Sequence, residues 1–139
     1  MKTVIFCTLL LGLSGCLPAN STNNHNNQVI SSNQTTENAK FQAFGNEPFW
    51  TVDVSPSEIA YSSLATDEKL TFPYVKPLSA DGRLPETVRV YQLEDGNNTM
   101  LIIRKSKGCS DTMSDGLHPY SSLFIRGDMV LEGCAHKLN

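Results

Sequence analysis

The residues whose types could do chemistry lie close together near the C-terminus. Asp111, Ser114, Asp115 and His118 fall within eight residues, and His136 follows. Such oxygen and nitrogen donors could bind a divalent metal, but their spacing matches no established ligand motif. We therefore predict no metal, and we expect the two aspartates to cap turns by accepting hydrogen bonds from backbone N–H groups.

The same serine, histidine and aspartate types also occur in hydrolases. No Gly-x-Ser-x-Gly elbow surrounds Ser114, and no distant residue completes a triad with a definable role. We therefore predict that the protein is not an enzyme and uses no cofactor.

A second group of candidates contains aromatic residues. Trp50, the only tryptophan, follows Glu47-Pro48-Phe49. Core packing is the ordinary role of such a residue, and an exposed platform for a ligand is the alternative. Glu47 could accept hydrogen bonds within its loop or supply a binding charge. The candidate binding residues are Glu47, Trp50, Asp111, Ser114, Asp115 and Tyr120.

Composition limits what these residues can serve. The 139 residues are 40% hydrophobic and 18% charged, which suits one small domain. Eleven Lys and Arg residues stand against fourteen Asp and Glu residues, a net charge of -3. No basic surface can therefore neutralise several phosphates, and we predict no nucleic-acid partner.

The N-terminus indicates export. Lys2 precedes the apolar run Val4–Leu13, which is typical of a secretory signal and too short to span a bilayer. The run ends in Leu13-Ser14-Gly15-Cys16, which resembles the lipobox of bacterial lipoproteins. The resemblance implies a signal peptide over residues 1–15, acyl chains such as palmitate at Cys16, and anchoring to a membrane.

Leu17, rather than Asp, follows the lipobox cysteine. By the sorting preference of enteric bacteria, this resembles an outer-membrane lipoprotein that faces the periplasm. From Leu17 to Ala39, Asn, Ser, Thr and Gln make up 15 of 23 residues. Such a stretch cannot build a core, so we predict a flexible tether over residues 16–40 and a folded domain over residues 41–139.

The predicted domain contains strand signals and no convincing helix, although 60–68 could form a short helical turn. Pro73 cannot donate to a strand ladder, which places its strand at an edge or at a bulge. Two hairpins are expected, with turns at 94–98 and at Gly127-Asp128. We predict an all-β domain, a small antiparallel barrel or sandwich of about six to eight short strands. The predicted strands are Phe49–Val54, Glu58–Tyr61, Lys69–Val75, Thr87–Leu93, Thr99–Arg104, Ser121–Arg126 and Met129–Gly133.

Four cysteines are present, but cleavage of the predicted signal peptide would remove Cys7, and the lipid that the lipobox implies would occupy Cys16. Cys109 and Cys134 remain, and an oxidising periplasm favours a disulfide between them. A redox-active or metal-binding pair is the alternative, but no Cys-x-x-Cys spacing supports it.

Two regions resemble a family of small bacterial envelope lipoproteins that are usually uncharacterised and sometimes grouped with heat-inducible META lipoproteins. One is Gly45-Asn46-Glu47-Pro48-Phe49-Trp50, and the other is 109–115 followed by Pro119-Tyr120 and Gly133-Cys134-Ala135. Relatives commonly carry Gly where Thr112 stands, and His118-Pro119-Tyr120 also departs from the family pattern. The resemblance implies an address in the envelope and no agreed activity.

Two functions remain open at this point. The first is a tethered binding or structural module whose partner is an envelope protein or a glycan. The second is an inhibitor of host lysozyme, because such inhibitors are also tethered, all-β and disulfide-linked. They present a Ser-Gly-x-x-Tyr loop, which the segment from Ser114 to Tyr120 approaches with a different spacing.

Overall fold

Alternation of apolar and polar residues shapes the domain in this computed structural model, which describes residues 39–113 and 115–139. The predicted signal peptide, the lipid cysteine Cys16 and nearly all of the predicted tether lie outside the described residues. The strands are β1 (Lys40–Asn46), β2 (Phe49–Val54), β3 (Glu58–Ser63), β4 (Glu68–Pro73), β5 (Val88–Leu93), β6 (Thr99–Ser110), β7 (Leu117–Arg126) and β8 (Met129–Leu138).

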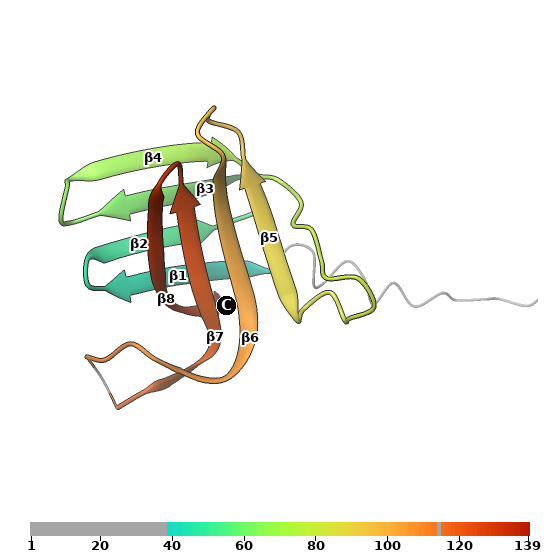
Figure 1. Cartoon of the computed structure of the whole chain (residues 1–139). Helices are drawn as coiled ribbons and strands as arrows, with labels where there is room; N and C mark the ends of the chain where they lie inside the picture. Colours follow the sequence, from blue (N-terminus) through green and yellow to red (C-terminus); the bar gives the residue numbers. More distant parts are fainter. Residues whose placement is uncertain (1–38, 114) are drawn as a thin grey trace, which may run out of the picture. The chain divides into compact units, whose positions relative to one another are not determined.

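All eight strands belong to one antiparallel sheet in the order β4-β3-β2-β1-β8-β7-β6-β5. The pairing of β1 with β8 joins the N-terminal four strands to the C-terminal four. Figure 1 shows the two groups crossing, with the sheet curled over itself. The all-β prediction is therefore confirmed, and the architecture is a curled half-barrel.

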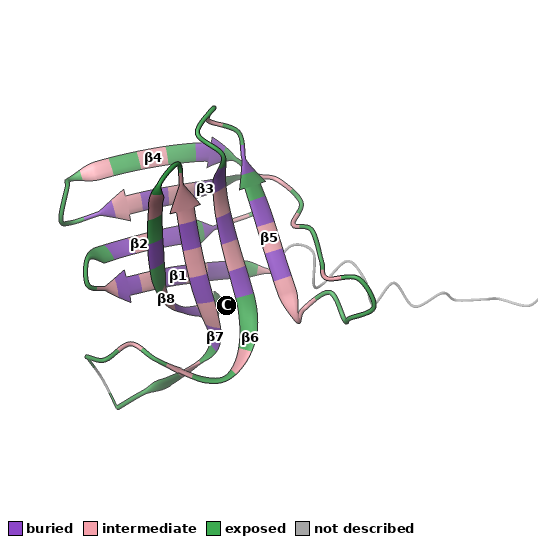
Figure 2. Ribbon diagram, viewed as in Figure 1, coloured by how far each residue is buried: buried purple, intermediate pink, exposed green. Residues whose placement is uncertain are grey.

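The concave side of this sheet holds the core. Along β1 and β2, every second residue is buried, and β3, β5 and the first half of β6 show the same alternation (Figure 2). The Tyr61 ring stacks on Phe124 with centroids 4.6 Å apart, and Tyr120 meets the edge of Phe41 at 5.2 Å. Aromatic packing of this kind holds the two strand groups together.

One charged side chain also enters the core. Arg89 on β5 is 2% exposed, and its guanidinium carbon lies 4.9 Å from the centre of the Phe41 ring. Its Nη1 atom donates a hydrogen bond to the Glu86 carbonyl. Burial raises the pKa of the neighbouring Tyr91 to about 12, although the positive charge of Arg89 opposes that rise. Among the described residues no carboxylate pairs with Arg89, and the Phe41 ring faces the guanidinium instead.

An ionic network centred on Arg126 lies at one end of the sheet. The Arg126 Nε atom lies 3.0 Å from Asp95 Oδ2, and its Nη1 atom lies 3.0 Å from Glu68 Oε1. Burial disfavours the Asp95 carboxylate, but hydrogen bonds from the Asn97 backbone, Thr99 and Arg126 outweigh it. They hold the pKa of Asp95 well below its usual range. The network links β4, the β5–β6 turn and β7.

Most predicted strands and both hairpins are confirmed. Gly127 has φ = 57°, as a primed two-residue turn requires at its first central position, and Pro73 ends the edge strand β4. The helical alternative for 60–68 is wrong, because Ala60 pairs with Asp53 in β3 and Glu68 begins β4. Strand β1 was not predicted, and β6 continues six residues beyond Arg104.

The disulfide prediction is also confirmed. Cys109 and Cys134 are bonded at 2.03 Å, with their Cα atoms 5.6 Å apart. The bond joins β6 to β8, although β7 lies between these strands in the sheet. It therefore holds the far end of β6 against the junction of β1 and β8.

Candidate binding site

Segments that are far apart in the sequence meet at the end of β1. The side-chain amide of Asn46 donates a 2.8 Å hydrogen bond to the carbonyl of Asp111, across 65 positions of sequence. The Glu47–Pro48 peptide bond, which is cis, forms the β1–β2 turn beside this contact. The disulfide brings Gly133 and Cys134 to the same place. The motif-bearing regions 45–50, 109–113 and 133–134 thus form one continuous surface.

A first depression at this surface, the acidic hollow, has a volume of about 320 Å³. Among residues 39–113 and 115–139, three carboxylates line it, those of Glu47, Asp111 and Glu132, and no Lys, Arg or His side chain does. The remaining wall is β1, the disulfide and its neighbours. The lining residues are Phe44, Gly45, Asn46, Glu47, Cys109, Ser110, Asp111, Thr112, Glu132, Gly133 and Cys134.

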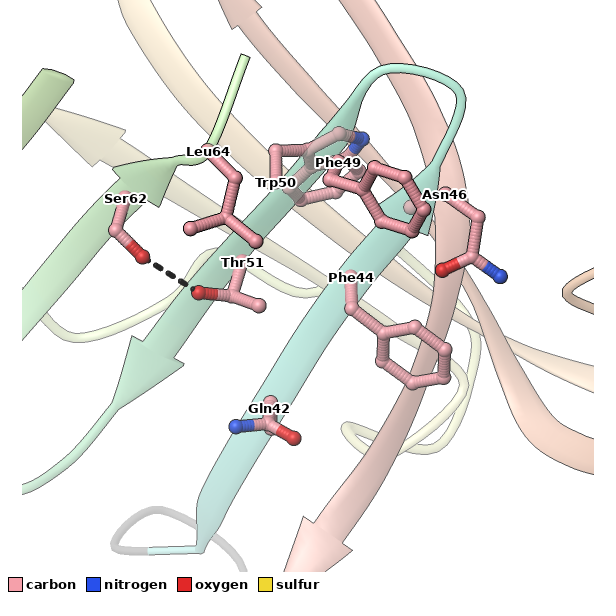
Figure 3. A pocket seen from close by; sticks show the side chains of 9 residues that line it. Gln42, Phe44, Asn46, Phe49, Trp50, Thr51, Ser62 and Leu64 are labelled. Carbon is pink, nitrogen blue, oxygen red and sulfur yellow. Dashed lines mark hydrogen bonds between the residues drawn. The ribbon is translucent and has the colours of Figure 1, made fainter. Parts of the chain in front are cut away.

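A second depression, the neutral hollow, has a volume of about 260 Å³ and is drawn in Figure 3. It shares Phe44, Gly45 and Asn46 with the acidic hollow, so the end of β1 separates the two. Within the described part of the chain, none of the side chains that line it is ionisable. The lining residues are Gln42, Phe44, Gly45, Asn46, Phe49, Trp50, Thr51, Ser62 and Leu64.

Two glycines allow these hollows to form. A Cβ atom at Gly133 would overlap the carbonyl oxygen of Phe44, and one at Gly45 would overlap the Trp50 indole nitrogen. Neither glycine has a positive φ, so space rather than backbone conformation requires them. Because Gly133 has no side chain, β8 can lie close to β1. Because Gly45 has none, the Trp50 indole can pack against the end of β1.

Two histidines pack against the Phe44 ring in edge-to-face contacts. The ring centroids of His118 and His136 lie 4.8 and 5.7 Å from the centroid of Phe44. The His118 Nε2 atom is 3.5 Å from Asp111 Oδ2 and, among the described residues, makes no hydrogen bond. Within residues 39–113 and 115–139, no three His, Cys, Asp or Glu side chains are placed to hold a metal ion.

The predicted site residues separate into groups. Asp111 accepts a 3.1 Å hydrogen bond from the Met113 backbone N–H, which confirms its turn-capping role. Glu47 is exposed and lines the acidic hollow. Asp115 is exposed in the β6–β7 loop, away from either lining, and Ser114 lies outside the described residues.

The two aromatic candidates belong to the core. Tyr120 is 7% exposed and packs on Phe41. Trp50 is 2% exposed and stacks on Phe124 at 6.3 Å, which matches the ordinary core role rather than an exposed platform. Trp50 nevertheless is one of the residues that line the neutral hollow.

Sequence reasoning missed the walls of the neutral hollow. Phe44 occupies the outward-facing register of β1, while Phe49 and Leu64 are 47% and 85% exposed. Large apolar side chains at solvent-facing positions are an informative departure from the usual pattern. Phe44, between Gln42 and Gly45, could have supplied that signal if β1 had been recognised.

No helix in the described part of the chain has the length and hydrophobicity needed to cross a membrane. Comparisons with protein-family models, with curated proteins and with solved structures found no match. The resemblance to envelope lipoproteins therefore remains a prediction from the motifs.

Proposed function

We propose that the protein is a bacterial envelope lipoprotein, anchored through acyl chains on Cys16, whose β-domain is a non-catalytic binding module. The two hollows at the end of β1 are its ligand-contacting surface. An envelope protein or a glycan is the partner class.

The observation that carries this proposal is the convergence of three distant regions on one hollowed surface. The Asn46–Asp111 hydrogen bond and the Cys109–Cys134 disulfide both stabilise that convergence. Gly45 and Gly133 provide the close approach that the hollows need. Ligand sites are typically depressions in which apolar side chains lie beside a few polar groups, and both hollows have this composition.

The predicted tether fits this role. A flexible coil of 23 residues has a root-mean-square reach of roughly 25–30 Å, which would let the domain contact partners beyond the lipid headgroups. Several acyl chains on one cysteine would make that attachment stable, because one chain alone gives only marginal binding.

The test uses the full chain in its native envelope, with a photo-crosslinking amino acid at Glu47. This residue is exposed and lines the acidic hollow. The matched control carries the same amino acid at Asp128, which is exposed at the opposite end of β7. A Cys16→Ser variant tests the anchor separately, and we expect it to leave the membrane fraction.

We expect ultraviolet-dependent adducts from position 47 in excess of those from position 128. Adducts of discrete mass would indicate a protein partner, and a heterogeneous ladder would indicate a glycan. Equal yields at the two positions, or none at either, would overturn the proposal.

The lysozyme-inhibitor alternative gains no support from the β6–β7 loop. A loop of that type must present its tyrosine to the enzyme, but Tyr120 is buried against Phe41. Inhibition of a c-type lysozyme by micromolar protein would nevertheless require us to replace the binding-module proposal.

A further inference from the structure

We infer that the neutral hollow binds a ring of an uncharged glycan, and this inference rests on the proposed binding function. The hollow combines three kinds of lining group: aromatic and aliphatic side chains, amides and hydroxyls. A pyranose ring offers the matching surfaces, because its C–H face is apolar and its rim carries hydroxyls.

The apolar part of the hollow is arranged around one space. Phe44 and Phe49 come from β1 and β2, and Leu64 follows β3 (Figure 3). Phe49 and Leu64 remain largely exposed, so a ligand would cover apolar surface that the domain itself leaves in water. Covering such surface favours binding by about 25 cal/mol per Å² before the costs of association are counted.

The amides are already oriented by hydrogen bonds. Gln42 donates through Nε2 to Asp53 Oδ1 at 2.9 Å, and Asn46 donates through Nδ2 to the Asp111 carbonyl at 2.8 Å. Among the described residues, neither amide oxygen accepts a hydrogen bond. Two fixed acceptors therefore flank Phe44, and a ligand must bring donors to satisfy them.

The hydroxyls add a donor. Thr51 Oγ1 and Ser62 Oγ lie 2.8 Å apart and share one hydrogen bond, so one of the two O–H groups is available to a ligand. Sugar hydroxyls both donate and accept, and they can pair with amide oxygens and with this hydroxyl at once. A hydrocarbon chain would leave all three polar groups unpaired, which costs binding energy.

Charge excludes the anionic alternatives. Among the described residues no cation lines the neutral hollow, and the adjoining acidic hollow carries three carboxylates. A phosphate, sulfate or uronate would meet no counter-ion and would be repelled from one side. The volume of about 260 Å³ falls just below the range of drug-sized ligand sites, which suits about one ring of a longer glycan.

Trp50 makes a direct test possible, because the only tryptophan of the chain is one of the residues that line this hollow. The full chain is reconstituted in liposomes and its fluorescence is titrated with chitotriose and maltotriose, which are neutral, and with trigalacturonate, which is anionic. We expect a saturable change with at least one neutral trisaccharide and at least tenfold weaker binding of trigalacturonate.

Two variants locate the effect. Phe49→Ala removes an exposed wall and Gln42→Leu removes a fixed acceptor, and each should weaken binding about tenfold. Leu84→Ala is the matched control, because Leu84 is 67% exposed and lines neither hollow. Unchanged thermal unfolding of each variant shows that a loss of binding is not a loss of fold.

The outcomes separate the two proposals. If no saccharide alters the fluorescence while position 47 still forms adducts, the glycan assignment is wrong and the binding module stands. If the adducts are absent as well, both fail. Equal affinity for trigalacturonate, an unchanged Phe49→Ala variant, or saturable binding of an apolar peptide in place of sugar would each overturn the glycan assignment.

Discussion

The two ends of β7 differ in how their polar groups are satisfied. At the Arg126 end, the guanidinium bonds to Asp95 and Glu68, and Asp95 also accepts a hydrogen bond from Thr99. At the other end, His118 Nε2 makes no hydrogen bond among the described residues, and the two hollows open beside it. At the Arg126 end the charged groups satisfy one another, although a depression of about 410 Å³ lined by residues 92–94 and 98–100 lies beside them, whereas the other end carries the two hollows at the end of β1.

The means of stabilisation differ as well. The Arg126 network includes Asp95 in the β5–β6 turn. The strand residues on either side of this turn, Leu93 and Thr99, are buried in the core. At the hollowed end, β6 runs from Lys105 to Ser110 without a single buried residue. Burial does not hold that extension; its pairing with β7, the Cys109–Cys134 disulfide and the Asn46–Asp111 hydrogen bond do. The Arg126 network therefore stabilises the fold, and the hollowed end is the one at which we propose ligand contact.

The largest expected effect is removal of the disulfide. Closing a chain segment of 25 positions lowers the entropy of the unfolded chain, which corresponds to about 3.5 kcal/mol of stability. We therefore expect a Cys109→Ser/Cys134→Ser variant to lose about that much in urea unfolding. Reductant should destabilise the wild type similarly and leave the variant unchanged. A loss below about 1 kcal/mol would show that other contacts hold the β6 extension.

The next effect concerns the contact between β1 and β8. Gly133→Ala places a methyl group on the Phe44 carbonyl, and the backbone has to move to relieve the overlap. We expect a loss of about 3 kcal/mol, at the upper end of overpacking costs. Gly108→Ala is the matched control, because its Cβ would meet only the exposed Leu117 side chain at 3.1 Å. Equal unfolding midpoints for the two variants would contradict the tight approach.

The Arg126 end should respond to pH. Asp95→Asn removes the charge that Arg126 faces, and we expect less destabilisation than from loss of the disulfide. Because folding lowers the pKa of Asp95, its contribution is complete above the unfolded pKa of about 4 and declines as pH falls towards the lower folded value. The gap in unfolding midpoint between wild type and variant should be constant from about pH 5 to 8 and shrink below about pH 4. A gap that does not change with pH would exclude the carboxylate charge as its cause.

Saccharide binding to the Asp95→Asn variant should be unaffected, since Asp95 lines neither hollow.

The sequence predicted strands where β-branched and aromatic residues alternate, as in β2 and β5, and predicted hairpins where Gly-containing turns separate such runs. It failed at β1, because Phe41 and Phe44 occupy opposite faces and blur the alternation. The disulfide followed from counting cysteines, and the Asp111 cap followed from its side-chain chemistry.

The neutral hollow escaped prediction for a different reason. Its walls come from β1, β2 and the residues that end β3, and only strand register brings Phe44 beside Thr51 and Ser62. Trp50 was selected for its type, but type alone could not show that the residue is buried and lines the hollow. Local pattern therefore indicated the elements, whereas the site depended on which solvent-facing positions pair across strands.

The smallest effect tests whether the hollowed end acts as one unit. Asn46→Ala removes the 2.8 Å hydrogen bond to Asp111 and should cost about 1 kcal/mol, the usual contribution of one neutral hydrogen bond. Asn46→Asp keeps the size but replaces the donor with a carboxylate facing a carbonyl, so it should cost at least as much. In the Cys109→Ser/Cys134→Ser background, the β6–β7 loop is no longer held in place, and we expect the Asn46→Ala cost to fall by at least half. This double-mutant cycle measures the coupling directly. Strict additivity would mean that the hydrogen bond and the disulfide stabilise separate structures. The hollowed end would then not be one continuous surface.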